Sequence, residues 1–62
     1  MREFLTAQDI ADLLRISRLR VYELFRLNPK YGGIPHYTIG ASKRVEKKDF
    51  EKWLNDRYKG VS

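Results

Sequence analysis

Three arginines fall within the stretch ISRLRVYELFR, residues 16–26, which also has the apolar spacing of an amphipathic helix. Arg18, Tyr22 and Arg26 are four residues apart, so a helix places them along one strip. A guanidinium group near the N-terminal end of such a helix can donate two parallel hydrogen bonds to O6 and N7 of guanine, and one such contact discriminates between bases by about 1–3 kcal/mol. The strip therefore has the chemistry needed to read base edges in duplex DNA.

Two further residues extend this candidate site. Ser17 can cap the helix and also contact a phosphate group, helped by the free N–H groups and the dipole at a helix N-terminus, while Arg20 lies toward the edge of the strip. The alternative is that these arginines form an ordinary solvated helix face, as most charged runs do. The elements around the segment favour DNA contact over that alternative.

A second group of cations lies in HYTIGASKRVEK, residues 36–47. Tyr37 and Ile39 alternate with polar neighbours before the small, turn-forming residues 40–43, and Val45 does so after them. This alternation predicts a two-stranded hairpin with Tyr37 in the core.

Lys43 and Arg44 are expected at the tip of this hairpin. Cations on a thin β-tip can follow the minor groove of a duplex and contact its phosphates without much reading of sequence. The alternative is that lysine there only prevents edge-to-edge pairing of strands. The lysines from Lys47 onward are expected to add a general positive field.

The helix that carries Arg18 is the second of two short amphipathic helices. The first covers about residues 7–15 and is capped by Thr6. Its inward positions follow helical spacing and are Ala7, Ile10, Ala11 and Leu14, with Leu13 widening the apolar side. Because only a few residues separate it from the second helix, about residues 17–27 with its cap, the pair predicts a helix-turn-helix.

The rest of the chain completes a small core. Pro29 ends the second helix and pushes Asn28 out of helical geometry. A third helix, about residues 48–59, is expected to close the core with one apolar stripe, formed by Phe50, Trp53, Leu54 and Tyr58. Tyr31 is expected to be exposed in the connecting loop.

The order FLTAQDIADLLRISRLRVYELFR, then IPHYTIGASKRVEKKDFEKWL, resembles the small winged helix-turn-helix domains of the excisionase and MerR-like superfamily. The matching residues are Leu5, Thr6, Ala11, Leu13, Leu14, Ile16, Ser17, Arg18, Val21, Tyr22, Leu24, Pro35, Gly40, Arg44, Val45, Asp49, Phe50, Trp53 and Leu54. The resemblance implies a mainly α fold with a small β-hairpin, in the order helix, helix, hairpin wing, helix, as one domain over residues 1–62. It also implies that the helix at 17–27 enters the major groove and the wing at 36–47 the minor groove.

Two features depart from that family. Arg15 occupies the turn between the first two helices, where related domains usually have glycine. Because a non-glycine residue in left-handed geometry costs about 1 kcal/mol, we expect a turn of different shape here. The linker NPKYGG, residues 28–33, is also longer than usual.

Composition limits the classes of function. The 62 residues carry 13 Lys and Arg against 8 Asp and Glu, a net charge of +5 that favours a polyanionic partner. There is no cysteine and His36 is the one histidine, so we expect no disulfide, no metal site, no cofactor and no catalytic residues. No apolar run approaches the ~20 residues of a membrane span, and the N-terminus lacks the apolar core of a signal peptide, so we expect a cytoplasmic protein with no membrane partner.

These observations favour sequence-specific binding of double-stranded DNA. By resemblance the chain is an excisionase, an accessory factor that bends DNA and helps an integrase excise a mobile element or phage. Its small size favours cooperative self-association on adjacent DNA sites. The alternative within the fold is a small transcriptional regulator of the MerR-like type. The alternative from another class is a basic adaptor that docks an acidic protein.

Overall fold

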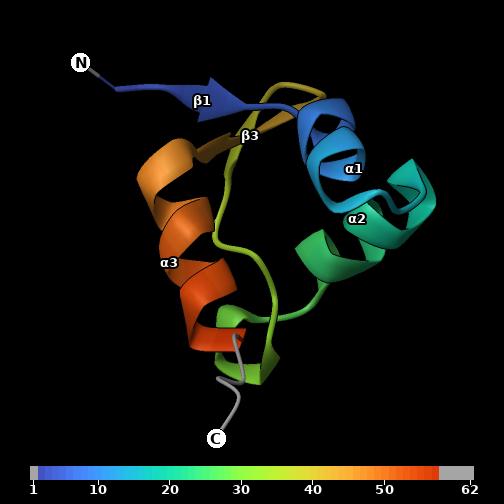
Figure 1. The fold of residues 1–62 in the computed structure, drawn as a ribbon. Helices are drawn as coiled ribbons and strands as arrows, with labels where there is room; N and C mark the ends of the chain where they lie inside the picture. The colour runs from blue at the N-terminus through green and yellow to red at the C-terminus, as the bar shows by residue number, and fades with distance from the viewer. Residues whose placement is uncertain (1, 58–62) are drawn as a thin grey trace, which may run out of the picture.

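The computed structural model describes residues 2–57, which form three α-helices and a small three-stranded antiparallel sheet (Figure 1). The elements, in chain order, are β1 (Phe4–Leu5), α1 (Ala7–Leu14), α2 (Arg18–Arg26), a short 3-10 helix (Pro29–Tyr31), β2 (Tyr37–Ile39), β3 (Ser42–Glu46) and α3 (Lys47–Arg57). The predicted order of helix, helix, hairpin and helix is confirmed, and β1 is an addition to it. The last residues of the predicted third helix, including Tyr58, lie outside the described residues.

α1 begins at a reciprocal pair of hydrogen bonds. The Asp9 N–H donates to Thr6 Oγ1 and the Thr6 N–H donates to Asp9 Oδ2, each at 3.0 Å. The helix ends at Arg15, which has φ 56° and ψ 46° and whose N–H donates to the Ala11 carbonyl. The expectation of a differently shaped turn is therefore wrong. Arg15 adopts the left-handed conformation in which glycine is the usual residue at a helix end.

α2 follows α1 after three residues, 15–17. Ser17 caps it, because the Arg20 N–H donates to Ser17 Oγ at 3.1 Å. The helix ends at Arg26, one residue earlier than predicted, since Leu27 and Asn28 both have extended backbone before Pro29. The effect of Pro29 on Asn28 is as predicted.

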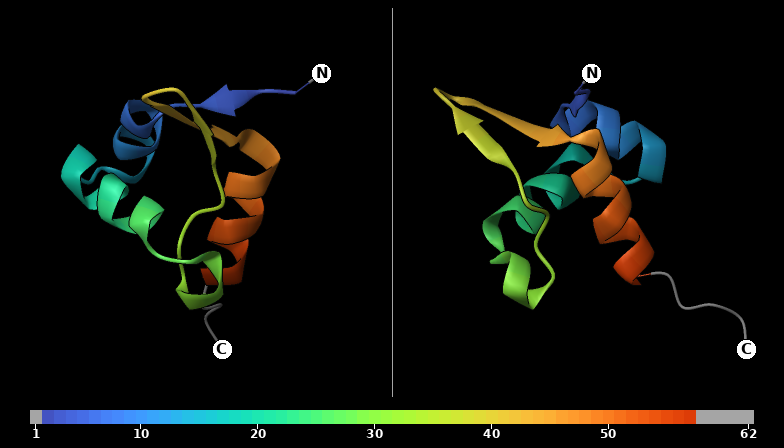
Figure 2. Two further views of the ribbon diagram at one scale, coloured as in Figure 1. Left: turned by 180° about the vertical axis from the view of Figure 1, so that it is seen from behind. Right: turned by 90° about the vertical axis from the view of Figure 1, so that its left-hand side faces the viewer.

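The sheet has the strand order β1–β3–β2, so β3 is the central strand. β1 pairs Leu5 with Val45, and β2 pairs Ile39 with Ser42 across a two-residue turn at Gly40–Ala41. Gly40 has φ 60°, and a positive φ at the first central residue suits a hairpin turn of this length. Figure 2 shows this β2–β3 hairpin projecting away from the helices.

The structure corrects two expectations about the hairpin. Lys43 and Arg44 do not form the tip, which is Gly40–Ala41; both lie within β3 and are half-buried. Tyr37, which was expected in the core, is 46% exposed, and its neighbour on the same strand, Ile39, is 64% exposed. Tyr37 instead packs edge-on against the ring of Phe4, with the ring centroids 6.0 Å apart.

The core gathers side chains from all three helices, β3 and the linker. Four of them are fully buried: Ile10, Val21, Ile34 and Val45. Phe25 and Phe50 complete it from α2 and α3, and Trp53 packs against it while partly buried. Leu13, expected to widen the apolar side of α1, is 63% exposed, because its position lies well off the centre of the stripe formed by the buried residues of that helix.

The long linker after α2 is held by the end of α3. Trp53 Nε1 and Arg57 Nη2 both donate to the Gly32 carbonyl, at 3.0 and 2.9 Å, and the Arg57 guanidinium lies 4.6 Å from the centre of the Trp53 ring. Gly32 has φ 98°. A Cβ atom on Gly33 would collide with the backbone of Leu27, so the chain passes close to itself at this point. The extra length is therefore ordered, and it leads into the buried Ile34.

Candidate nucleic-acid interface

The predicted strip on α2 lies on the outside of the molecule. Val21 and Phe25 face the core, and the helix turns Arg18, Tyr22 and Arg26 toward solvent. Tyr22 is 40% exposed, with its ring edge-on to that of Phe25 at 6.0 Å. The core thus fixes the orientation of the helix, and the strip remains available to a partner.

The fold brings part of this strip beside the β2–β3 hairpin. One hollow of about 240 Å³ connects the N-terminal parts of α1 and α2 with the hairpin. Its lining residues are Thr6, Ala7, Gln8, Arg18, Tyr22, Ala41, Ser42, Lys43 and Arg44. Four of the seven residues predicted for DNA contact therefore meet on one concave surface, although they come from opposite halves of the chain.

The other three predicted residues lie outside this hollow. Ser17 uses its hydroxyl oxygen to cap α2. Arg20 Nη1 lies 3.3 Å from Glu23 Oε1, one helical turn away, so a local carboxylate partly offsets its charge. Arg26 is exposed at the end of the strip, away from the hairpin.

The hairpin cations are held in defined positions. Lys43 Nζ donates to Thr38 Oγ1 at 3.3 Å across the strands, and Arg44 Nη1 donates to the Lys43 carbonyl at 3.0 Å. Because side chains alternate along a strand, Lys43 shares the helix-facing side of β3 with the buried Val45, while Arg44 shares the other side with Tyr37. The two cations thus leave the strand on opposite faces, near the edge of the hollow.

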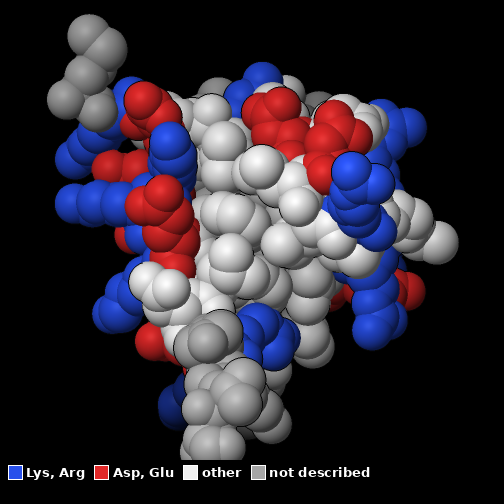
Figure 3. All heavy atoms as spheres, in the orientation of Figure 1, with Lys and Arg blue, Asp and Glu red and all other residues white. Residues whose placement is uncertain are grey.

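These cations are not neutralised within the described part of the chain. The ion pairs among residues 2–57 join Arg2 to Glu46, Arg20 to Glu23 and Lys47 to Glu3, and none involves Arg18, Arg26, Lys43 or Arg44. Acidic side chains gather over α1 and alternate with cations along α3 in Figure 3, on the face from which the hairpin points away. The charge distribution therefore favours anion binding on the side that carries α2 and the hairpin.

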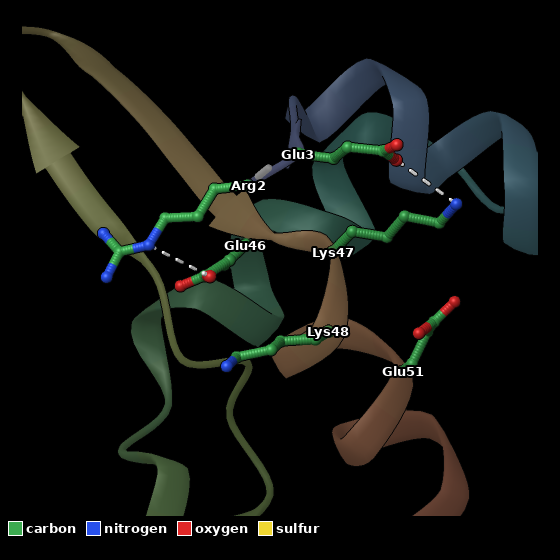
Figure 4. A pocket seen from close by; sticks show the side chains of 6 residues that line it. All are labelled: Arg2, Glu3, Glu46, Lys47, Lys48 and Glu51. Carbon is green, nitrogen blue, oxygen red and sulfur yellow. Dashed lines mark ion pairs between the residues drawn. The ribbon is translucent and has the colours of Figure 1, made fainter.

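A second and larger hollow of about 470 Å³ lies between β1, β3 and α3, and its chemistry is different (Figure 4). It is lined by three cations and three carboxylates: Arg2, Lys47, Lys48, Glu3, Glu46 and Glu51. Arg2 Nε lies 3.6 Å from Glu46 Oε2, and Lys47 Nζ lies 3.3 Å from Glu3 Oε1. Because its charges balance, this hollow is a poor site for a polyanion.

Thr6 and Gln8, at the N-terminal end of α1, also line the candidate interface, although neither was predicted to contact DNA. In the sequence, Thr6 is predicted only as a helix cap. The available signal was the helix-turn-helix pattern itself, because in such motifs the first helix crosses the DNA backbone while the second enters the groove. Within residues 2–57 no group of three side chains is arranged to hold a metal ion, and no helix there has the length and apolarity to cross a membrane.

Comparison with known proteins identifies the class. The chain belongs to a family of helix-turn-helix domains, which it matches over residues 4–58. Helix-turn-helix domains bind DNA, with the second helix of the motif in the major groove, so DNA is the partner that this family indicates.

One curated relative is the uncharacterized protein YvgK of Bacillus subtilis (strain 168), which is 35% identical over 48 residues. The match covers 77% of this chain but 14% of YvgK, so the matched segment corresponds to about one seventh of the length of that protein. No significant match is found among solved structures.

Proposed function

We propose that this chain is a winged helix-turn-helix domain of the excisionase and MerR-like type that binds double-stranded DNA with a sequence preference. In this proposal α2 enters the major groove and the β2–β3 hairpin is the wing in the adjacent minor groove. The main support for this proposal is the shared hollow, which is lined by Arg18 and Tyr22 of α2 and by Lys43 and Arg44 of the hairpin. None of these cations has a described carboxylate as partner.

The proposed roles follow from position on α2 and β3. Arg18, the first residue of α2, supplies the bidentate contact to guanine. Ser17, Arg20 and Arg26 contact phosphates on either side of the groove, with Arg20 the weakest because Glu23 competes for its guanidinium. Lys43 and Arg44 follow the minor groove, and Tyr22 packs between the two contact regions.

For the biological role, we propose an excisionase that bends DNA near an attachment site, associates cooperatively with further copies and assists an integrase. The resemblance of residues 4–55 to that superfamily supports this role. Footprinting on DNA that flanks the gene separates it from the regulator alternative: protection of an attachment site favours excision, and protection confined to a promoter favours transcriptional control.

The DNA-binding proposal is tested by selecting bound sequences from random duplexes and measuring affinity for the selected site by fluorescence anisotropy. Arg18→Ala should weaken binding to that site by roughly tenfold to a hundredfold, the worth of one bidentate contact, and should relax the preference at one base pair. Lys48→Ala is the matched control, because it removes the same charge from the charge-balanced hollow and should leave the preference intact.

Two results would count against the proposal. If no sequence is enriched and duplex binding stays weak at low salt, the basic surface serves a different partner, and the adaptor alternative gains support. If Arg18→Ala and Lys48→Ala lower the affinity equally at every sequence, Arg18 contributes only charge and does not read a base.

A further inference from the structure

Leu19, the second residue of α2, is an apolar side chain on a cationic surface. It is 67% exposed and lies between Arg18 and Arg20 in the chain. It belongs neither to the buried core nor to the partly buried residues packed against it, to which α2 contributes Val21, Phe25 and Leu24. Single exposed leucines are common on proteins, so exposure alone assigns no role to Leu19. Its position on the helix indicates whether it has one.

That position is beside the strip proposed to face DNA, which is formed by Arg18, Tyr22 and Arg26. Tyr22 and Arg26 are three and seven residues after Leu19, so the three side chains occupy one exposed sector of α2. Tyr22 lines the hollow beside the hairpin, whereas Leu19 does not. Leu19 therefore extends the strip on the side away from the hairpin, in the first turn of the helix, from which base edges are read in helix-turn-helix motifs.

We propose that Leu19 contacts the 5-methyl group of a thymine in the major groove, next to the base that Arg18 reads. The inference rests on the proposed function and makes its specificity more definite. Among the four bases only thymine presents a methyl group in the major groove, and apolar side chains recognise it by direct contact. The cations around Leu19 bind a polyanion, and thymine is the part of that polyanion with an apolar surface for the leucine to cover. The proposed contact requires DNA, because uracil lacks the methyl group and the A-form major groove of RNA does not admit side chains.

The experiment replaces thymine by deoxyuridine, which removes the methyl group and leaves every hydrogen-bonding atom in place. In the site selected by the wild-type protein, each thymine is replaced singly and binding is measured by anisotropy. At one position the replacement should weaken wild-type binding about fourfold, the worth of one buried methyl group. Leu19→Ala should weaken binding to the thymine site and should no longer distinguish thymine from uracil at that position.

Leu13→Ala is the matched control. Leu13 is as exposed as Leu19, at 63%, but it lies on α1, outside the hollow and outside the strip. This variant should retain the full difference between thymine and uracil. Thermal melting of both variants should match the wild type, since neither side chain belongs to the core.

The thymine contact is refuted, while the proposed function stands, if the wild type enriches a sequence but binds its thymine and uracil forms equally at every position. It is also overturned if Leu19→Ala keeps the same discrimination as the wild type. If no sequence is enriched from random duplexes, the proposed function fails and the thymine contact fails with it, so the two failures are distinguishable.

Discussion

Arg15 stores backbone strain in the turn between α1 and α2, and replacing it by glycine should stabilise the protein. Arg15 has φ 56° and is the one non-glycine residue with positive φ among residues 2–57. Its side chain is exposed, and within that part of the chain it makes no hydrogen bond or ion pair. Removing the side chain therefore loses no contact that the structure shows.

The size of the effect is a difference between two opposing contributions. Left-handed geometry costs a residue with a Cβ atom roughly 1–2 kcal/mol, and glycine relieves that cost. Glycine also makes the unfolded chain more flexible, which takes back roughly 0.4–1 kcal/mol. The net gain in the free energy of unfolding should be about 0.8 kcal/mol, and in a domain of this size that raises Tm by roughly 3–6 °C.

The assay is thermal unfolding followed by circular dichroism, with Arg15→Ala as the control. Alanine removes the same charge and the same long side chain but keeps the Cβ atom, so it should melt close to the wild type. The reasoning is refuted if the glycine variant melts no higher than the alanine variant, because the strain in the turn would then be negligible.

Two further predictions concern the linker and the hairpin. Gly33→Ala should lower the free energy of unfolding by about 1–3 kcal/mol in urea denaturation, because the new Cβ meets the Leu27 backbone. Gly40→Ala is the control and should cost less, because a Cβ atom there meets open space and only the φ is unfavourable. Equal losses in the two variants would contradict the close approach at Gly33. Lys43→Ala should weaken binding to all duplexes alike and reduce the slope of log affinity against log salt by about one unit, whereas an unchanged slope would show that Lys43 contacts no phosphate.

Local chemistry was sufficient to predict the helices. Thr6 and Ser17 each cap a helix with the expected hydrogen bond, and Pro29 follows directly on the extended residues that end α2. These interactions join residues within one turn of each other, so the sequence contains all the information they need. The prediction failed at Arg15, where tertiary packing of the two helices imposes a backbone geometry against the local preference of the residue.

The sheet was harder to predict, for a physical reason. β1 has two residues, too few to show any alternation, and it exists because Leu5 can pair with Val45 forty residues later. In the hairpin, alternation correctly predicted strands, but it could not say whether a helix lies beneath either face. Tyr37 and Ile39 lie on β2, which is an edge strand of the sheet, and their apolar side chains remain exposed.

The candidate interface could likewise be predicted from the sequence only in part. The four-residue spacing placed Arg18, Tyr22 and Arg26 on one strip, since the helix alone decides that arrangement. Their approach to Lys43 depends on β3, which is fixed from one side by β1 and from the core by Val45. The two cationic groups thus meet through contacts between distant parts of the chain, so a change in β1 should alter DNA binding without touching any residue that is proposed to contact DNA.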